Sequence, residues 1–396
     1  MNRQKCLFHH QLKIIATKPP LRQETEALST MRINRDEFFM ARALELARKG
    51  WGRTNPNPLV GAVIVKNASI IAEGFHHAVG SPHAEVDAFA HADADARGGT
   101  LYVNLEPCCH YGRTPPCTDA IIRAGVSRVV VAMPDPNPCV AGNGIRLLRE
   151  AGIDVTVGIL EREARQFNEI FVKFITSNRP FVLMKCAMTL DGKIASVTGD
   201  SKWISSESSR NYVHALRDRF AAIMVGIGTV MQDNPTLTTR LASGRGKDAL
   251  RIVVDSAGRI PLDANVITTP SNAGMLLATT DALPAEKEAQ LVESGARIVK
   301  TPAVGGHVDL NALMSALHAS NIDSVLLEGG GTLNAAALQA GIVDKVMLFI
   351  APKLIGGERA VTPVGGAGIA RMADALRVHD LSVARYDDDV LIEGYL

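Results

Sequence analysis

The sequence predicts an α/β fold divided into two domains, and three observations lead to this expectation. The chain has 396 residues, which is more than one hydrophobic core usually organises. Short apolar runs alternate with helical patterns along both halves, as is typical of layered α/β domains. The turn-forming segment Ser177-Asn-Arg-Pro180 interrupts this alternation near the middle. We therefore expect a disordered extension over residues 1–33, one domain over 34–178 and a second over 179–396.

The first domain is expected to begin with a helix and to continue as alternating strands and helices. Asn34-Arg-Asp-Glu37 has the spacing of a capping box, and Gly50 favours the end of that helix. A short polar turn at 66–69 separates two apolar runs, which indicates a strand pair. The expected strands are 59–65, 70–72, 100–105, 128–133 and 153–157. The expected helices are 34–50, 83–91, 118–124, 146–150 and 161–177.

The second domain shows the same alternation but no visible sequence repeat of the first. This indicates a fusion of two different units rather than a duplication. The expected strands are 181–187, 221–225, 252–255, 275–278, 324–327 and 346–350. The expected helices are 206–219, 285–293, 310–319 and 333–340.

Composition argues against several classes of protein. The 42 basic and 41 acidic residues give a net charge of +1, so no broad basic field for nucleic acid is expected. Aromatic residues, which would stack on bases, make up only 5% of the chain. Six unevenly spaced cysteines do not make a secreted disulfide framework, which favours a reducing cytoplasm. No apolar run approaches the roughly 18 residues of a membrane helix.

The first 30 residues differ from the rest of the chain. They contain several basic residues, and the first acidic residue is Glu24. Histidine, glutamine and lysine side chains interrupt the apolar run at 6–15, so it is not the core of a signal peptide. An organellar targeting segment and a disordered extension ahead of Met31 both remain open.

The clearest chemistry in the sequence is a group of potential metal ligands. His83-Ala-Glu85 is followed by Cys108 and Cys117, each directly after a proline. One imidazole and two thiolates fill three corners of a zinc tetrahedron and leave the fourth for a water molecule. Glu85 is then placed to carry a proton to a leaving amine. This order is typical of zinc-dependent base deaminases, and core packing of these residues is the plainer alternative.

The two cysteines are farther apart than in the usual Pro-Cys-x-x-Cys element. The residues between them include His110 and Arg113. The forked guanidinium of arginine fits phosphate oxygens, so this insert indicates a phosphorylated small molecule rather than a free nucleoside. Cys109 is an alternative ligand, although the proline directly before Cys108 favours Cys108.

The second half contains two glycine turns that each follow a predicted strand. Glu328-Gly-Gly-Gly-Thr-Leu-Asn334 also precedes a helix, where backbone amides favour a phosphate. Gly226-Ile-Gly-Thr229 is the second turn, and Asp233 follows it. Two such turns suit a cofactor that lies across the edge of a sheet, with Lys185 and Asp233 as ionisable groups near the cleft. A tight turn without a ligand and solvated surface charges are the alternatives.

These motifs together resemble the bifunctional deaminase/reductase family of riboflavin biosynthesis. The resemblance covers nearly everything from about residue 34 onward, and the long cysteine spacing is specific within the deaminase superfamily. Cys109 departs from the small residue that the family usually has there. The matching stretches are Asn57-Pro-Leu-Val-Gly61, His83-Ala-Glu-Val86, Glu106 to Cys117, Asp135-Pro-Asn-Pro138, Met188-Thr-Leu-Asp-Gly-Lys193, Trp203-Ile204, Asp233-Asn-Pro235, Val254-Asp-Ser256 and Glu328-Gly-Gly-Gly331.

The resemblance implies a cytidine-deaminase-like three-layer domain followed by a dihydrofolate-reductase-like domain. It implies deamination of 2,5-diamino-6-(5-phosphoribosylamino)pyrimidin-4-one with Zn²⁺, and then NADPH reduction of the ribosyl group to ribityl. It also implies a homo-oligomer, dimer or tetramer, in the cytoplasm, with neither nucleic acid nor membrane as a partner.

The resemblance also implies a role for each matching residue. The zinc ligands are His83, Cys108 and Cys117, and the catalytic residues are Glu85, Lys185 and Asp233. The deaminase substrate contacts are Asn57, His76, His110 and Arg113. The cofactor contacts are Ala187, Trp203, Thr229, Asp233, Ser256, Gly330, Gly331, Thr332, Leu333, Asn334, Ala335 and Ala336. The reductase substrate contacts are Lys185, Ser201, Arg217, Leu237, Arg240 and Glu328.

Two rival functions remain to be tested. A nucleic-acid base deaminase with an appended binding module would need the basic or aromatic surface that the composition lacks. A zinc base deaminase with a non-catalytic C-terminal domain would not need the glycine turns, Lys185 or Asp233 in the second half.

Overall fold

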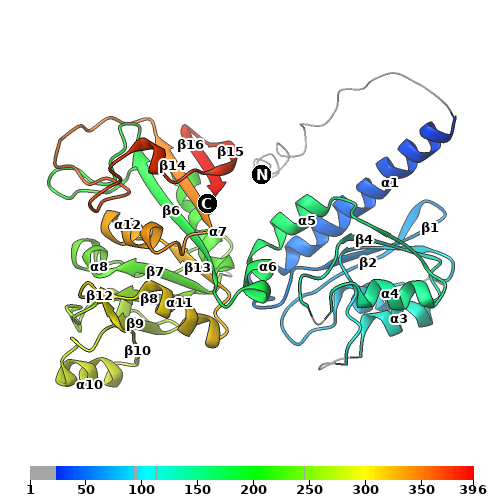
Figure 1. Cartoon of the computed structure of the whole chain (residues 1–396), viewed down its shortest axis with the longest axis horizontal. Helices are drawn as coiled ribbons and strands as arrows, with labels where there is room; N and C mark the ends of the chain where they lie inside the picture. Colours follow the sequence, from blue (N-terminus) through cyan, green and yellow to red (C-terminus); the bar gives the residue numbers. More distant parts are fainter. Residues whose placement is uncertain (1–23, 93–95, 112–114, 139, 245) are drawn as a thin grey trace.

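A computed structural model of the chain describes residues 24–92, 96–111, 115–138, 140–244 and 246–396. Two α/β domains lie along the long axis of the molecule and meet where α6 (Glu169–Thr176) leads into β6 (Phe181–Thr189) (Figure 1). Among the helices described, none has the length and apolar character to cross a membrane. The predicted α/β fold is confirmed in both halves.

The sheet of the first domain has five strands in the order β2-β1-β3-β4-β5. β1 is antiparallel to β2 and β3, whereas β3, β4 and β5 are parallel to one another. Helices α1 and α5 cover one face, and α3 and α4 cover the other (Figure 1). The strands are β1 Gly61–Lys66, β2 Ser69–Phe75, β3 Thr100–Leu105, β4 Arg128–Met133 and β5 Asp154–Val157. The helices are α1 Glu24–Ala47, η2 Arg48–Gly50, α2 Ala84–Ala90, α3 Cys117–Ala124, α4 Asn143–Glu150 and α5 Glu161–Phe167.

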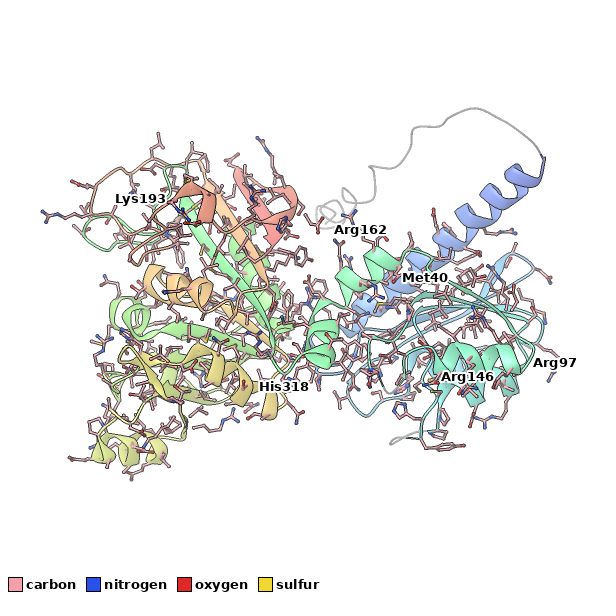
Figure 2. All side chains as sticks on the ribbon, viewed as in Figure 1. Met40, Arg97, Arg146, Arg162, Lys193 and His318 are labelled. Carbon is pink, nitrogen blue, oxygen red and sulfur yellow. The ribbon has the colours of Figure 1, made fainter. Side chains whose placement is uncertain are left out.

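The central strands of this sheet are apolar on both sides because helices cover both faces. Every residue of β4 after its first is buried, and β1 is buried up to its last residue. Met40, labelled in Figure 2, is fully buried on α1. A Cβ atom at Gly61 would lie 2.1 Å from the carbonyl oxygen of Ala43, so glycine permits the close approach of β1 to α1. The expected three-layer arrangement is therefore present.

Two helices of the first domain differ from the expectation. α1 begins at Glu24, so the predicted capping box at Asn34–Glu37 lies inside the helix, and residues 24–33 belong to α1. Glutamate, alanine and leucine in that segment favour continued helix. The single helix expected over 161–177 is two helices that meet at Asn168. The Asn168 side chain bonds both the N–H and the carbonyl of Leu59, at 2.8 and 3.0 Å, which ties this break to the segment before β1.

The second domain contains a nine-stranded sheet in the order β10-β9-β8-β7-β13-β6-β14-β16-β15. Its pairings are parallel from β10 to β14, and the hairpin of β15 and β16 completes it antiparallel. Besides β6, the strands of this sheet are β7 Ala222–Gly226, β8 Leu250–Val254, β9 Met275–Thr279, β10 Ala296–Lys300, β13 Ser324–Leu327, β14 Lys345–Ala351, β15 His379–Tyr386 and β16 Asp389–Tyr395. The short strands β11 Ala303–Val304 and β12 His307–Val308 form a separate two-stranded sheet. The helices are α7 Glu207–Arg219, α8 Ile227–Asp233, α9 Asn265–Thr268, α10 Ala285–Glu293, α11 Leu310–Ala319, α12 Gly331–Gln339 and η3 Met372–Asp374.

The six strands and four helices expected in this domain are all present within a few residues. The elements that were missed have weak apolar patterns. β15 carries mostly exposed residues, and β10 is only partly buried. The second glycine turn is shorter than expected, because α8 begins at Ile227 directly after Gly226 and extends to Asp233.

Helix α6 joins the two domains through both polar and apolar side chains. Glu169 accepts a hydrogen bond from Tyr395 at 2.5 Å and lies 3.5 Å from the Lys345 ammonium. Ile170 belongs to an apolar cluster that otherwise consists of second-domain residues. His318, labelled in Figure 2 at the end of α11, contacts the ring of Phe174 with centroids 4.5 Å apart. The domain interface is therefore packed rather than a bare linker.

Candidate active sites

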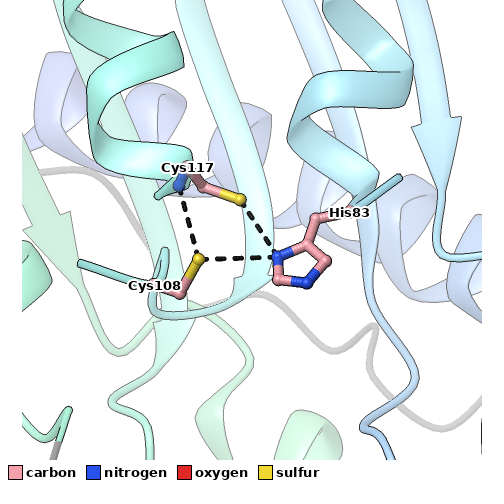
Figure 3. Close-up of side chains that lie close together, drawn as sticks. All are labelled: His83, Cys108 and Cys117. Carbon is pink, nitrogen blue, oxygen red and sulfur yellow. Dashed lines mark hydrogen bonds between the residues drawn. The ribbon is translucent and has the colours of Figure 1, made fainter. Parts of the chain in front are cut away.

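The three side chains predicted as zinc ligands converge in the first domain. His83 is the N-cap of α2, Cys117 opens α3, and Cys108 lies on the loop between β3 and α3. Figure 3 shows the three side chains pointing toward one another. His83 Nδ1 lies 3.2 Å from Cys117 Sγ and 3.5 Å from Cys108 Sγ. All three ligand atoms lie within 4.8 Å of one another.

This donor set fits a zinc ion. With Zn–S bonds of about 2.3 Å and Zn–N bonds of about 2.0 Å, an N···S edge of the tetrahedron measures about 3.5 Å. The two N···S distances here are close to that length. Three protein ligands leave one corner open, which is the arrangement of a catalytic rather than a structural zinc site.

The thiol groups of Cys108 and Cys117 shift each other's pKa in opposite directions. The hydrogen bond from the Cys117 thiol lowers the pKa of Cys108 to about 4. The backbone N–H of Cys117 also donates to Cys108 Sγ at 3.3 Å. The same thiol pair and burial raise the pKa of Cys117. A dication held by both sulfurs would displace the remaining proton, since thiolates are the metal-binding form.

Glu85 is buried beside this group on the first turn of α2, with 3% of its surface exposed. Burial raises the pKa of Glu85 to about 7, and the negative charge of Cys108 acts in the same direction. A carboxyl group with this pKa is present in both protonation states near neutral pH. It can therefore both accept and donate a proton, as a general acid–base requires.

Two of the residues predicted to bind the deaminase substrate lie next to the zinc ligands. Asn57 Nδ2 lies 3.2 Å from His76 Nε2, and the rings of His76 and His83 are 5.6 Å apart in a perpendicular arrangement. Burial lowers the pKa of His76 and so favours its neutral imidazole. These two side chains therefore bond to each other beside the metal-ligand group.

The insert between the cysteines is only partly described. His110 is exposed, and Arg113 lies outside the described residues. Cys109 is half-buried and its thiol is not part of the metal-ligand group, which contains Cys108. The phosphate-binding role of the insert therefore stays a prediction.

Sequence reasoning missed the carboxylate that fixes the loop behind the zinc ligands. Glu106 is buried at the end of β3 and accepts hydrogen bonds from the backbone N–H groups of Asp135, Gly142 and Ile145 at 3.1, 2.9 and 3.1 Å. It thereby caps α4 and anchors the chain next to Pro107, which precedes Cys108. The signal was present, because Glu106 directly precedes the Pro-Cys element.

The second domain gathers charged residues at the carboxyl ends of its parallel strands. Glu328 follows β13 and receives a two-pronged ion pair from Arg217 of α7 at 2.8 and 2.9 Å. The Lys185 ammonium on β6 lies 3.8 Å from the same carboxylate. Although burial opposes it, the charges of Arg217 and Lys185 lower the pKa of Glu328 to about 2. The predicted substrate contacts from three different elements are thus brought together.

The segment after α8 supplies further side chains to this cluster. Arg217 Nη1 donates to the Thr238 carbonyl at 3.1 Å, and Arg240 donates to the Thr238 hydroxyl at 3.0 Å. Leu237, the residue before Thr238, is buried and has a φ of +53°, which turns the chain at this point. The two arginines therefore both bond to one short segment of the chain.

The two glycine turns lie side by side, as the sequence predicted. A Cβ atom at Gly330 would lie 3.5 Å from Thr229 Oγ1, and one at Gly226 would lie 3.5 Å from Leu333 Cβ. A Cβ at Gly331 would lie 2.5 Å from the Thr362 carbonyl, so no side chain fits there. Helices α8 and α12 thus begin next to each other at the carboxyl ends of β7 and β13, which is where α/β sheets bind cofactors.

Two of the predicted cofactor contacts, Leu333 and Asn334, have buried side chains. Leu333 and Asn334 point into the core, so only their backbone can face a ligand. Asn334 Nδ2 donates to the carbonyls of Gly329 and Pro363 at 3.1 and 2.8 Å, which makes it an anchor for the start of α12.

The other predicted contacts of this domain are exposed or partly buried. Trp203 is 62% exposed, and the Arg210 guanidinium lies 4.6 Å from its ring centroid. Ser201 donates to Asp233 at 3.4 Å, which brings a predicted substrate contact and a predicted catalytic residue together. The hydroxyl of Ser256 accepts from the Val308 N–H at 3.1 Å. Ala187 lies on β6 beside Phe349 of β14.

His214 is a residue of this cluster that sequence reasoning missed. Its Nδ1 accepts the backbone N–H of Arg240 at 3.3 Å. Burial, followed by the charges of Arg217 and Arg240, lowers the pKa of His214 to about 4. The signal was available, since His214 and Arg217 are three residues apart on one helix and therefore share a face.

Two different family models match the chain, one in each of the two domains. The family model of the cytidine and deoxycytidylate deaminase zinc-binding region matches residues 33–133. The family model of the RibD C-terminal domain matches residues 180–392, which is more than half of the chain.

Curated relatives resemble both halves together. The riboflavin biosynthesis protein RibD of Actinobacillus pleuropneumoniae is 47% identical over 359 residues, covering 90% of this chain and 94% of that relative. The riboflavin biosynthesis protein RibD of Escherichia coli strain K12 is 40% identical over 369 residues, covering 90% and 98%.

Solved structures show the same arrangement along the chain. RibD of Acinetobacter baumannii aligns with a TM-score of 0.81 at 38% identity and covers 92% of this chain and 99% of its own. A diaminohydroxyphosphoribosylaminopyrimidine deaminase/5-amino-6-(5-phosphoribosylamino)uracil reductase of Thermotoga maritima aligns with a TM-score of 0.81 at 39% identity, with the same coverage.

Proposed function

The chain belongs to the RibD family of bifunctional riboflavin-biosynthesis enzymes, and we propose that it carries out two successive reactions. It deaminates 2,5-diamino-6-(5-phosphoribosylamino)pyrimidin-4-one and then reduces the ribosyl group of the product to ribityl with NADPH. The observation that carries this proposal is the presence of both sites in one chain. A His/Cys/Cys group lies beside a buried glutamate in the first domain, and paired glycine turns lie beside a charged cluster in the second.

In the deaminase domain, His83, Cys108 and Cys117 would hold zinc. When bound, zinc supplies an acidified water molecule as the nucleophile. Glu85 accepts one proton from the attacking water and passes it to the ring nitrogen. It then accepts a second proton, from the hydroxyl group that has added to the ring carbon, and passes it to the amine, which leaves as ammonia.

The substrate of the deaminase is oriented by the side chains around this centre. Asn57 and His76 face the pyrimidine beside the zinc ligands. His110 and Arg113 bind the phosphate, which would explain the long insert between the cysteines.

In the reductase domain, the backbone of residues 330–336 and the Thr229 hydroxyl bind the phosphates of NADPH. Ala187, Trp203, Asp233 and Ser256 complete the cofactor crevice. NADPH supplies the hydride when bound.

The reductase substrate is held by the charged cluster. Arg217 and Arg240 bind its ribose phosphate, and Glu328 keeps Arg217 and Lys185 in place. Lys185 and Asp233 are the ionisable groups that we assign to proton transfer, with Ser201 and Leu237 as further contacts.

A deaminase with a non-catalytic C-terminal domain is less well supported. A domain kept only as a scaffold does not need Glu328, Arg217 and Lys185 paired in a crevice, because buried charges are costly to desolvate. The match of residues 180–392 to the RibD C-terminal domain also favours a working reductase.

We infer that the enzyme is a cytoplasmic homo-oligomer. β15 is the last strand of the nine-stranded sheet, and Leu381 and Val383 on it are 63% and 68% exposed. A second copy that pairs with this edge would cover both side chains in a symmetric contact. Light scattering during size-exclusion chromatography measures the mass of the particle, and a monomeric mass contradicts this inference.

A coupled assay on the purified full-length protein tests the proposed function. Metal analysis should find zinc, ammonia should be released from the phosphorylated pyrimidine, and NADPH should be oxidised only with the deaminated product. Ammonia release without NADPH oxidation would support the scaffold alternative. No reaction with the phosphorylated pyrimidine would refute the proposal.

A further inference from the structure

A short segment of the deaminase domain, residues 51–57, contacts the other domain on one side and the deaminase site on the other. We call it the bridging loop. It follows α1 and η2 and ends at Asn57, which lies beside His76. The loop therefore links the deaminase site to the reductase domain.

The bridging loop packs directly on the end of α7. Arg53 forms an ion pair with Asp218 at 3.1 Å. Gly52 has a φ of +73°, and a Cβ atom there would lie 2.4 Å from the carbonyl oxygen of Asp218. A side chain at this position would therefore separate the loop from α7.

A buried carboxylate of the reductase domain holds the middle of the loop. Asn55 Nδ2 donates to Asp323 Oδ2 at 2.6 Å. Asp323 is 2% exposed, and its other oxygen accepts the Ser324 hydroxyl at 2.7 Å. It directly precedes β13, the strand that leads to Glu328 of the reductase cluster. On the reductase side, the Asp323 carboxylate is therefore fixed by burial and by its bond to Ser324. On the deaminase side, it is bonded to the side chain of Asn55.

The far end of the loop reaches the zinc ligands through hydrogen bonds. His76 Nδ1 lies 3.0 Å from the Pro82 carbonyl, which can only accept, so the proton is on Nδ1. His76 Nε2 therefore accepts the hydrogen bond from Asn57 Nδ2 at 3.2 Å. Pro82 directly precedes His83, so this series of contacts connects the loop to a metal ligand.

We propose that Asp323 of the reductase domain is a positioning residue of the deaminase. Through Asn55 it fixes the bridging loop, so that Asn57 and His76 meet the pyrimidine beside the zinc ligands. The proposal rests on the substrate-binding role assigned above to Asn57 and His76. It makes the reductase domain a structural part of the deaminase.

Removing either partner in the full-length zinc enzyme tests this proposal. Asn55→Ala and Asp323→Ala should each raise the KM of deamination about tenfold, with less change in kcat. Zinc content and NADPH oxidation with the deaminated substrate should stay unchanged. The double variant should be no worse than the more affected single variant, because both changes remove one interaction.

A reciprocal exchange separates positioning from general stability. Asn55→Asp alone places two carboxylates face to face and should raise KM most. Adding Asp323→Asn recreates a donor and an acceptor in the opposite sense and should restore most of the native KM. If the exchanged pair is no better than Asn55→Asp alone, the proposal is wrong.

Lys173→Ala is the matched control, since it removes a different interdomain ion pair, to Asp344 at 2.7 Å. It should leave the KM of deamination unchanged, and an equal rise would show general loosening of the interface instead. If Asp323→Ala does not fold, the Asn55 variants carry the test. Native deamination with an unchanged KM in these variants overturns this inference alone, whereas no deamination by the native enzyme overturns the proposed function.

Discussion

The zinc-ligand group and the charged cluster of the reductase domain are both partly buried polar sites, but they are assembled in different ways. The zinc ligands lie between His83 and Cys117 and are delivered by two helix starts and one loop. Lys185, Arg217 and Glu328 come from widely separated segments that meet only because β6, β7 and β13 are neighbours in the sheet. The first site depends on local spacing, whereas the second depends on the topology of a whole domain.

The strongest test of this contrast is the loss of one zinc ligand. Cys117→Ser should abolish zinc binding and deamination together, because serine is a poor zinc ligand at neutral pH. NADPH oxidation with the deaminated substrate should remain near the native rate, since His83, Cys108 and Cys117 all lie in the other domain. Metal analysis and the two assays on one preparation measure this. Retained zinc with native deamination would mean that Cys117 is not a ligand.

A second test separates the acid–base group from the metal ligands. Glu85→Gln should keep zinc but lower kcat of deamination by about 10²–10⁴-fold, because proton transfer by a positioned side chain is lost. Burial raises the pKa of Glu85 to about 7, so native deamination should also change with pH around neutrality. Loss of zinc in Glu85→Gln would show instead that this residue is a ligand.

This contrast also explains what the sequence could predict. The His/Cys/Cys group was predicted from residue type and spacing, and the structure brings its three side chains together on elements that were expected within a few residues. The roles of Asp323 and Glu106 were not found, because each depends on which backbone or side chain the fold brings near it. The prediction that a helix begins at Asn34 was wrong for a local reason, because α1 begins at Glu24 and continues through the capping-box sequence.

A third test addresses the cluster that depends on topology. Glu328→Gln leaves Arg217 and Lys185 without a countercharge, so kcat/KM of reduction should fall by about tenfold or more. Deamination should be unaffected, because the cluster lies in the other domain. If both activities fall equally while circular dichroism stays native, the two sites are not separate.

The same residue predicts a stability difference that depends on pH. The pKa of Glu328 is lowered from the usual 4.5 to about 2 in the folded protein, so its ion pairs stabilise the fold fully above pH 4.5. That contribution is lost as pH falls from 4.5 towards 2. Urea unfolding should therefore show Glu328→Gln less stable than the native protein at neutral pH, and the gap should close in acid. A constant gap across this range would contradict the assigned pKa.

The smallest expected effect concerns where the reductase domain begins. Ile170 of α6 packs with Leu216 and Phe220 of the second domain, and Glu169 bonds Tyr395. A fragment that starts at Arg179 lacks these contacts, so its melting temperature should lie about 5–10 °C below that of a fragment starting at Glu169. Ile170→Ala in the longer fragment is the control and should account for part of the difference.

Both fragments should still oxidise NADPH with the deaminated substrate, since Lys185, Arg217 and Glu328 all lie within them. Equal melting temperatures would show that α6 stabilises only the deaminase domain. If the fragment starting at Arg179 is less stable but still reduces the substrate, the reductase site is complete without α6. The apolar core of the second domain would then be incomplete without it. The site and the core would then have different boundaries in the sequence, because the site depends on strand order and the core depends on every helix packed against the sheet.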